Sequence, residues 1–320
     1  MTGRLALPSL ADVQAAHRRL QAYVHRTPIL SSRFLGDRIG ARVHLKAENL
    51  QRGGSFKIRG ALNAILRARE EGRLGSAPVV TYSSGNHGQG VALAAQIAGC
   101  AAVVVVPEDV IGVKRAAMEG YGARVVACGH TSEERRVRAE EIVSETGALM
   151  IPPFDHPHVI AGQGTIALEV FADLPGAGAI VVPVGGGGLI AGIALAASAL
   201  SPDIRIYGVE PETADGMRRS LLAGRPVTIS PSRSIADGLR AVRPGDLCFA
   251  AARAHVAEVW TVGEESMRMA QRDLLSRAKL LVEPSGAIAV AAIAERSAEL
   301  AGRTVVAILS GGNTELADLL

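Results

Sequence analysis

The chain has 320 residues, which is long enough for two domains and a large core. Hydrophobic residues make up 48% and aromatic residues only 3%, so the core must consist mainly of aliphatic side chains, as expected where helices pack on buried parallel strands. The formal net charge is +3 and no basic block interleaves with aromatic residues, which argues against a nucleic-acid-binding protein.

The first part of the chain predicts a helix, a strand and a second helix. Ser9 can cap a helix over residues 9–25, residues 43–47 alternate like a strand, and residues 60–70 look helical. Just before the second helix lies Gly53-Gly54-Ser55-Phe56-Lys57-Ile58-Arg59-Gly60. Glycines let a backbone approach a ligand closely, and a desolvated lysine forms Schiff bases with carbonyl compounds. Taken alone, this lysine also fits a solvated residue at the start of a surface helix.

From residue 78 onwards, short strands alternate with helices. This alternation predicts a parallel sheet with crossover helices, and we take residues 78–150 as a small α/β domain inserted into a large domain made of residues 1–77 and 151–320. The strands are expected at residues 79–82, 102–106 and 124–127, and the helices at residues 89–97, 114–119 and 132–146.

The second half continues the same pattern with a long Pro- and Gly-rich interruption that extends to about residue 247. Its elements are predicted as a helix at 164–174, a strand at 179–184, a helix at 189–200, a strand at 204–210, helices at 264–278 and 285–294, and a strand at 305–309.

A run of four glycines, Gly185-Gly186-Gly187-Gly188, follows an apolar strand and opens a helix. Backbone N–H groups converge in such a loop and the helix N-terminus adds partial positive charge, so the pattern predicts a phosphate site. Gly186, Gly188 and Ala191 also fit the dinucleotide fingerprint, with Glu210 near the offset of a ribose-binding acid. A nicotinamide-dependent oxidoreductase therefore competes at this point.

Two further loops are candidates for a binding site. Ser83-Ser84-Gly85-Asn86-His87-Gly88 is rich in donors and precedes a helix, so it could clamp a carboxylate. His87 alone is equally typical of a structural histidine, and no G-x-S-x-G elbow indicates a hydrolase. Ser310-Gly311-Gly312-Asn313 follows the last strand, and ligands of α/β proteins bind at the carboxyl ends of parallel strands.

Cysteine spacing and hydropathy restrict the class further. Three cysteines lie far apart without a C-x-x-C pair, so neither a zinc site nor a disulfide framework is indicated. No apolar run reaches transmembrane length without glycine or proline, and the N-terminus has no signal pattern. We expect a cytoplasmic protein that binds neither membrane nor nucleic acid.

Taken together, the four motifs around Lys57, Ser83–Gly88, Gly185–Gly188 and Ser310–Asn313 resemble fold-type II pyridoxal-phosphate enzymes, in the branch of threonine/serine dehydratases and serine racemases. The resemblance runs from about Leu10 to Asn313. It implies an α/β fold of the tryptophan synthase β type, with two open twisted α/β/α domains, the small one inserted in the large one. It also implies a homodimer.

The resemblance implies a role for each motif. Lys57 would hold pyridoxal phosphate covalently, next to Phe56, and act as the base at the substrate Cα. Gly185 to Gly188 would bind the phosphate, Asn86 the ring hydroxyl, and Ser310 the pyridine nitrogen. Ser83, Ser84, Gly85, Asn86 and His87 would hold the substrate carboxylate.

The implied activity is that of an ammonia-lyase, which converts a β-hydroxy amino acid of the L-threonine or L-serine type into a 2-oxo acid and ammonia. Ser84 leaves a second activity open, because in serine racemases of this family a serine here acts on the face opposite the lysine. Arg135 falls where relatives can carry a substrate-gating arginine, and Pro152-Pro153-Phe154 departs from the usual pocket wall. A hydroxyaspartate or another bulky substrate is therefore a third alternative.

The family's divalent cation site is only partly present. Glu210 and Ala214 match two of its ligands, but the third position is Gly216 instead of an aspartate. Loss of an oxygen ligand weakens Mg²⁺ or Ca²⁺ binding, so the sequence leaves metal dependence open.

Overall fold

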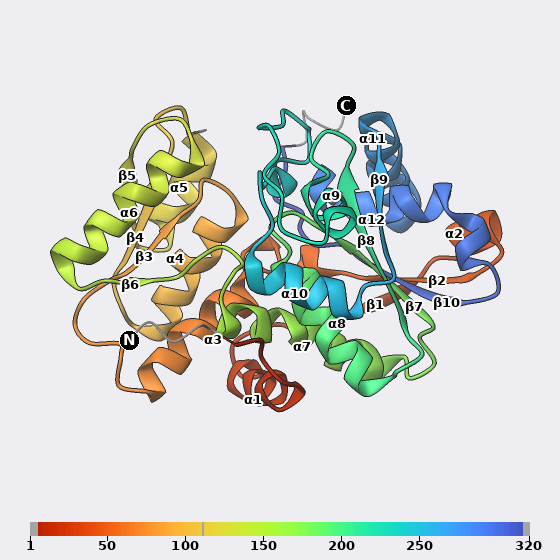
Figure 1. Cartoon of the computed structure of the whole chain (residues 1–320), viewed down its shortest axis with the longest axis horizontal. Helices are drawn as coiled ribbons and strands as arrows, with labels where there is room; N and C mark the ends of the chain where they lie inside the picture. The colour runs from red at the N-terminus through yellow and green to blue at the C-terminus, as the bar shows by residue number, and fades with distance from the viewer. Residues whose placement is uncertain (1–5, 111, 316–320) are drawn as a thin grey trace.

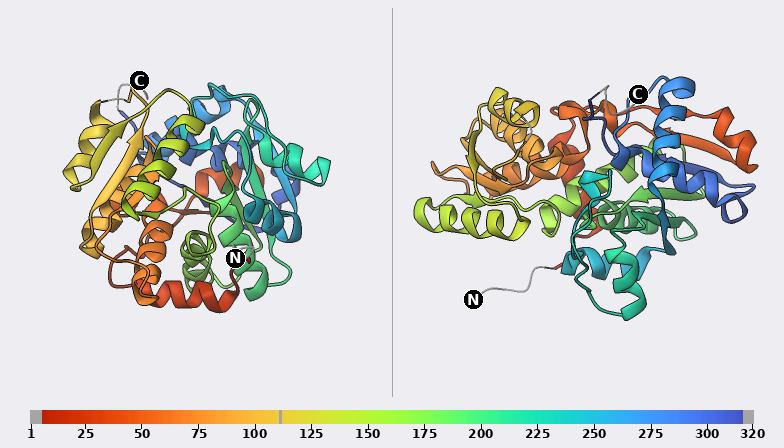
Figure 2. Two further views of the ribbon diagram at one scale, coloured as in Figure 1. Left: turned by 60° about the vertical axis from the view of Figure 1, so that its left-hand side comes forward. Right: turned by 90° about the horizontal axis from the view of Figure 1, so that it is seen from above.

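Two β-sheets organise the chain, and their elements form two lobes side by side (Figures 1 and 2). The computed structural model describes residues 6–110 and 112–315. The larger sheet has the strand order β1-β2-β10-β7-β8-β9, and only the β1–β2 pair is antiparallel. Its strands are β1 (Ile29–Ser31), β2 (Arg42–Lys46), β7 (Ala179–Pro183), β8 (Arg205–Pro211), β9 (Glu258–Val262) and β10 (Thr304–Ile308).

The larger sheet is buried on both faces, because successive side chains of a strand point to opposite sides. In β7, Ile180 and Val182 pack into one hydrophobic cluster, while Ala179 and Val181 pack into a second. The first cluster includes residues of α1 (Leu10–Leu20), α7 (Pro157–Asp173), α8 (Gly188–Leu200) and α10 (Asp246–His255). The second includes residues of α2 (Arg33–Ile39), α11 (Glu264–Asp273) and α12 (Pro284–Glu295).

The smaller sheet has the order β5-β4-β3-β6 and is parallel throughout. In β4, Val104 packs with α3, α4 and α5, whereas Val103 and Val105 pack with α6 on the other face. These elements are β3 (Val79–Tyr82), β4 (Ala102–Val106), β5 (Arg124–Ala127), β6 (Leu149–Met150), α3 (Lys57–Glu70), α4 (Asn86–Ala98), α5 (Gly112–Gly120) and α6 (Ser132–Thr146).

The predicted α/β fold with two sheets is confirmed, and most predicted elements are found within a few residues. Ser9 caps α1 as expected, accepting from the N–H of Asp12. Helices α3, α4 and α7 begin three to seven residues earlier than predicted, so Lys57 and Asn86 each open a helix. The domain boundaries at residues 78 and 150 stay a prediction.

Several short elements were missed. The sequence analysis did not expect β1, α2, α9 (Gly216–Ala223), α10 or β9, nor the 3₁₀ turns η1 (Glu48–Leu50), η2 (Arg52–Gly54) and η3 (Asp237–Leu239). The last part of the predicted helix 264–278 is a π-helical turn, η4 (Leu274–Ala278), and α13 (Ser297–Leu300) is a single turn. Short segments carry too few residues for periodicity to reveal them.

The strands β2, β3, β7 and β10 are followed by the four glycine-containing motifs. The carboxyl ends of parallel strands lie at one edge of a sheet, and ligands of open α/β sheets bind there. Within the described residues, no helix is both long and apolar enough to cross a membrane. The fold therefore directs attention to the strand ends.

Candidate active site

Lys57 occupies the first position of α3, at the junction of the two lobes. Its Nζ donates to the carbonyl oxygen of Pro153 at 2.9 Å, and burial lowers the pKa of Lys57 to about 8. Helix α4 passes close by: a Cβ added to Gly90 would lie 3.1 Å from the Cβ of Lys57. The side chain is thus held in a partly buried position with an amine that is neutral at mildly alkaline pH.

A buried group of four charges fixes the helix that carries Lys57. Arg59 donates to Glu48 and to Glu169, with Nε–Oε2 and Nη1–Oε1 distances of 2.8 and 2.7 Å. Lys46 adds a 2.6 Å contact to Glu169. All four side chains are at most 3% exposed, and Arg59 and Lys46 lower the pKa of Glu169 although burial opposes this shift. Sequence reasoning missed this network, which ties α3 to α7 and to the end of β2.

The tetraglycine loop joins β7 to α8 and leaves no room for side chains. A Cβ on Gly186 would come within 2.3 Å of the Phe154 ring, and one on Gly187, which has φ +98°, within 2.7 Å of Met217. Within the described residues, the N–H groups of Gly185, Gly186 and Gly187 donate no backbone hydrogen bond. The loop therefore presents free N–H groups next to the start of α8, which suits an anion.

The motif at residues 83–88 lies at the end of β3 and the start of α4. Ser83 Oγ accepts from the N–H of Gly85 at 3.3 Å, which shapes the turn. His87 is buried, its Nε2 lies 3.0 Å from the carbonyl oxygen of Ile151, and its Nδ1 has no partner among the described residues. Burial, reinforced by Lys57, lowers the pKa of His87 to about 3, so the ring is neutral.

Asn86 joins this motif to the last strand. Its Nδ2 donates to Glu283 Oε1 at 2.6 Å, and its Oδ1 accepts from Asn313 Nδ2 at 2.8 Å. Asn313 Nδ2 also lies 2.9 Å from the carbonyl oxygen of Gly53. Glu283 is 4% exposed, and burial raises its pKa to about 8. Glu283 was not among the predicted site residues; the only signal was its place before Pro284 at the start of a helix.

The four motifs are brought together by these contacts. The N–H of Phe56 donates to the carbonyl oxygen of Ser310 at 3.1 Å, and Ser55 forms an isolated bridge with Gly311. Ser310 is buried and its Oγ donates weakly to the carbonyl oxygen of Ser285 at 3.3 Å. Phe154, next to the carbonyl that accepts from Lys57, lies against the tetraglycine loop. Segments from four parts of the chain thus surround one position.

Ser84 and Arg135 are the two polar side chains with the fewest protein partners. Ser84 is partly buried and makes no side-chain hydrogen bond within the described residues. Arg135 donates to the carbonyl oxygen of His130 at 3.3 Å and to Ser132 Oγ at 3.0 Å, while its buried Nε has no partner there. Burial lowers the pKa of Arg135, and no carboxylate pairs with it among the described residues.

Glu210 is engaged with the protein itself. Its two carboxylate oxygens accept from the N–H groups of Met217 and Arg218 at 2.8 and 2.9 Å, at the start of α9. Burial raises the pKa of Glu210 to about 8, although these two bonds oppose the shift. Asp215 pairs with Arg219 at 2.7 Å. In the described part of the chain no group of three His, Cys, Asp or Glu side chains is placed to hold a metal ion.

The same contacts correct the dinucleotide alternative. A ribose-binding acid needs a free carboxylate at the end of its strand. The carboxylate of Glu210 is 1% exposed and directed at α9, so it does not face the tetraglycine loop as a ligand. The match to the dinucleotide fingerprint is a property of the strand–glycine–helix turn alone.

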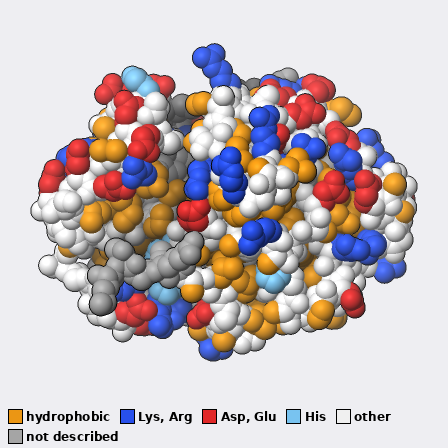
Figure 3. Space-filling view, in the orientation of Figure 1, with side chains coloured by type: hydrophobic (Ala, Val, Ile, Leu, Met, Phe, Trp, Pro, Cys, Tyr) orange, Lys and Arg blue, Asp and Glu red, His pale blue; other side chains and the backbone are white. Residues whose placement is uncertain are grey.

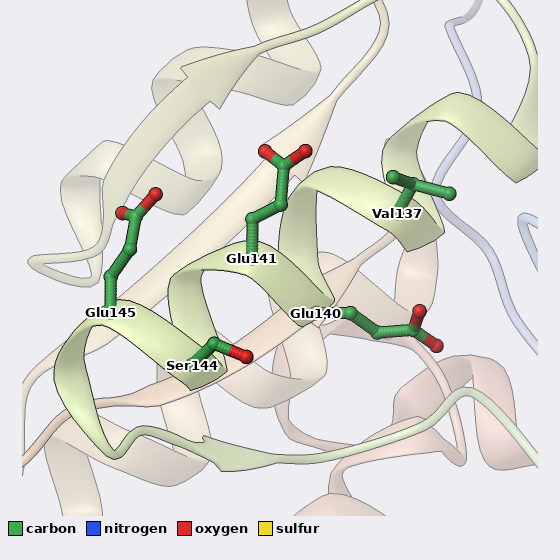
Figure 4. Close-up of a pocket in the computed structure, with 5 residues that line it drawn as sticks. All are labelled: Val137, Glu140, Glu141, Ser144 and Glu145. Carbon is green, nitrogen blue, oxygen red and sulfur yellow. The ribbon is translucent and has the colours of Figure 1, made fainter.

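Surface features elsewhere are of an ordinary kind. Figure 3 shows acidic, basic and hydrophobic side chains interspersed on one face. A hollow beside α6 is lined by Val137, Glu140, Glu141, Ser144 and Glu145 (Figure 4). Glu140 pairs with Arg136, and Glu141 and Glu145 pair with Arg138. These carboxylates are neutralised by their own helix, and the hollow contains none of the four motifs.

The residues at the junction fit pyridoxal phosphate. The tetraglycine loop offers an anion cradle that a single Cβ would fill, Lys57 offers an amine of lowered pKa, and Asn86 offers an amide beside them. The chain belongs to the family of pyridoxal-phosphate dependent enzymes, whose model matches residues 20–311.

Relatives with three different names are similar over nearly the whole chain. The L-threo-3-hydroxyaspartate ammonia-lyase of Saccharomyces cerevisiae is 41% identical over 98% of this chain and 95% of its own. The structure of maize serine racemase matches with a TM-score of 0.93 and 37% identity, over 98% and 95%. The structure of a threonine deaminase from T.th. matches with a TM-score of 0.91 and 47% identity, over 97% and 99%. The protein is therefore a pyridoxal-phosphate enzyme of the fold-type II class.

Proposed function

We propose that the protein is an ammonia-lyase that converts a β-hydroxy amino acid of the L-threonine or L-serine type into a 2-oxo acid and ammonia. The observation that carries this proposal is the amine of Lys57, whose pKa is lowered to about 8 at the point where the four motifs meet. Relatives named ammonia-lyase and deaminase support it.

Binding follows from the backbone and amide groups of the site. The free N–H groups of Gly185 to Gly187 and the positive end of α8 bind the cofactor phosphate. Lys57 holds the cofactor covalently, with Phe56 beside it, and Asn86 and Ser310 contact the ring. Ser83 to His87, at the positive end of α4, bind the substrate carboxylate. His87 is neutral and so takes part through its hydrogen bonds instead of a charge.

Bound pyridoxal phosphate supplies an electron sink for negative charge at the substrate Cα. Lys57 Nζ, displaced by the substrate amine, takes the proton from Cα, because an amine with a pKa near 8 serves as a base at neutral pH. The β-hydroxyl then leaves as water. Phe154 and the glycine loop pack closely over this region and exclude bulk solvent.

The test is an assay of 2-oxo acid and ammonia over a panel of β-hydroxy amino acids, with purified protein loaded with pyridoxal phosphate. We expect product from at least one of L-threonine, L-serine and L-threo-3-hydroxyaspartate, and none with Lys57→Ala. A wild-type protein that is colourless and takes up no pyridoxal phosphate would refute the proposal.

The free hydroxyl of Ser84 favours amino acid racemisation as a second candidate function. Two acid/base groups on opposite faces of Cα are what racemisation requires, and we assign them to Lys57 and Ser84. Chiral chromatography after incubation with L-serine, L-threonine and L-aspartate decides between the two activities. We expect Ser84→Ala to abolish formation of the D-isomer and to leave most of the elimination activity. If the wild type forms no D-isomer, this candidate is withdrawn.

Arg135 favours a third candidate, a substrate with a second carboxylate such as 3-hydroxyaspartate. Its guanidinium has no carboxylate partner among the described residues and its Nε is buried. We expect Arg135→Leu to raise the KM for L-threo-3-hydroxyaspartate more than the KM for L-threonine. Equal effects on both substrates would count against this assignment.

Three further expectations stay proposals: the domain boundaries at residues 78 and 150, a homodimer, and a cytoplasmic location. Size-exclusion chromatography with light scattering tests the second, and limited proteolysis tests the first. The cation ligands Glu210 and Ala214 also stay a prediction, and the melting temperature with Mg²⁺ or EDTA tests them.

A further inference from the structure

We propose that Glu283 is a positioning residue, which holds the amide of Asn86 in the single orientation that directs an N–H group at the ring oxygen of pyridoxal phosphate. The inference rests on the proposed cofactor contact of Asn86 and adds to it the group that makes this contact directional. Neither Glu283 nor Asn313 is needed for that contact by its own reach.

The contacts of Asn86 determine its orientation. An amide side chain has one acceptor oxygen and one NH₂ group with two donors, and its two ends are nearly equal in shape. Here the oxygen accepts from Asn313 Nδ2 at 2.8 Å, and the nitrogen donates to Glu283 Oε1 at 2.6 Å. One N–H of Asn86 remains unused by the protein, and it is a donor.

The opposite orientation is excluded twice. Turning the amide by 180° would place the NH₂ of Asn86 against the NH₂ of Asn313, and its oxygen against the oxygen of Glu283. Asn313 cannot turn to compensate, because its Nδ2 also lies 2.9 Å from the carbonyl oxygen of Gly53. A buried donor or acceptor left without a partner costs about 1–3 kcal/mol, so Glu283 and Asn313 together act as a lock.

The backbone around Glu283 is built for this close approach. A Cβ on Gly311 would come within 2.5 Å of Glu283 Oε1 and 3.0 Å of Asn86 Nδ2. A Cβ on Gly54 would come within 2.2 Å of Asn313 Oδ1. The N–H of Glu283 donates to the carbonyl oxygen of Gly311 at 3.1 Å, which fixes its main chain at the start of α12. Glycines at these positions allow the three side chains to meet.

The environment of Glu283 preserves its role as acceptor. Burial raises its pKa, with a further rise from Asp237, while Asn86 and Lys114 act in the other direction. A carboxyl group accepts a hydrogen bond through one oxygen even when the other is protonated. Asn86 therefore keeps its orientation whether Glu283 is charged or neutral, and its free N–H favours an ionised ring oxygen on the cofactor.

The decisive experiment measures pyridoxal phosphate itself, not turnover. Glu283→Leu removes the acceptor at similar volume, and Glu283→Gln restores an oxygen without a charge. We expect Glu283→Leu to weaken pyridoxal-phosphate binding by the full-length apoenzyme about tenfold. The visible spectrum of its holoenzyme should shift towards the form with a neutral ring oxygen. Glu283→Gln should stay close to wild type in both readouts.

A double-mutant cycle separates positioning from a general structural effect. In an Asn86→Ala background, Glu283→Leu should add no further loss of affinity and no spectral shift. If it adds the same loss there, or if Glu283→Gln behaves like Glu283→Leu, the positioning role is refuted. If Glu283→Leu fails to fold, Asn313→Ala removes the other half of the lock and should give the same spectral shift. A wild-type protein that binds no pyridoxal phosphate defeats the proposed function, whereas unchanged binding in all variants defeats only this inference.

Discussion

At the scale of single residues, burial gives Lys57 its chemistry. An exposed lysine stays protonated to a pH above 10, and only the neutral amine attacks a carbonyl. In this protein burial outweighs the neighbouring Cys248 and Glu283 and lowers the pKa of Lys57 to about 8. The side chain thus gains reactivity at neutral pH from its place in the fold.

This pKa predicts how cofactor capture depends on pH. The fraction of neutral amine increases as pH rises towards the pKa, so the rate of pyridoxal-phosphate capture by the apoenzyme should rise with pH. It should level off above about 8, where Lys57 is already neutral. Stopped-flow absorbance over a pH series measures it, with Lys57→Ala as the blank. A rate that keeps rising steeply to pH 10 would mean that Lys57 is not desolvated.

At the scale of elements, close packing against glycines shapes the site. The loop between β7 and α8 lies against the Phe154 ring, with no space for a Cβ at Gly186. Gly90 allows α4 to approach Lys57, and Gly311 allows Glu283 to approach Asn86. The glycines therefore matter here through the neighbours that they admit.

Gly186→Ala tests this packing. Its Cβ would overlap the Phe154 ring at 2.3 Å, so we expect a destabilisation of about 1–3 kcal/mol and weaker cofactor binding. Thermal unfolding and pyridoxal-phosphate titration measure the two effects. Gly176→Ala is the matched control, because no atom lies within 4 Å of the added Cβ. Adding Phe154→Leu should recover part of the loss, and no recovery would place the clash elsewhere.

Helix α9 provides a second prediction at this scale. Glu210 caps α9 with both oxygens, and Gly216 supplies no carboxylate, so we expect EDTA and Mg²⁺ to leave the melting temperature of the wild type nearly unchanged. The nearest atom to an added Cβ at Gly216 is 3.7 Å away, so an aspartate fits. Gly216→Asp should therefore create stabilisation by Mg²⁺, and Gly216→Asn should create less. A wild type that is stabilised as strongly as Gly216→Asp would contradict this reasoning.

At the scale of the whole molecule, one ion pair links the two lobes beside the site. Lys114 of α5 contacts Asp237 of η3, with an Nζ–Oδ2 distance of 2.6 Å. The 3₁₀ turn η3 adjoins the tetraglycine loop, since the carbonyl oxygen of Gly238 lies 3.1 Å from a Cβ placed on Gly185. The pair therefore connects the lobe of the smaller sheet to the phosphate cradle.

Breaking this pair should affect substrate binding more than stability. The two side chains are 28% and 41% exposed, and such pairs contribute at most about 1 kcal/mol, so we expect Lys114→Ala to raise KM by up to about fivefold. The reversed pair Lys114→Asp with Asp237→Lys should recover much of the loss. Arg115→Ala is the matched control, because Arg115 pairs with Glu119 inside the same helix. An equal rise in KM for this control would refute a role of the link between lobes.

The sequence by itself determined the order of the elements and the four motifs. Alternation of apolar strands and helices encodes local structure, and glycine-rich turns after strands encode anion sites, so Lys57, Asn86 and Gly185 to Gly188 were found without coordinates. The relation among the motifs came from a family resemblance, and the family is confirmed.

Only the tertiary structure decided which residues support the motifs. Asn86 meets Glu283 across 197 positions of the chain, and Lys57 meets the carbonyl of Pro153 across 96. Contacts of this kind depend on how two sheets and their helices pack, and local periodicity carries no record of them. The pKa of Lys57, the capping role of Glu210 and the orientation of Asn86 all follow from such distant contacts, which is why none of them could be read from the sequence.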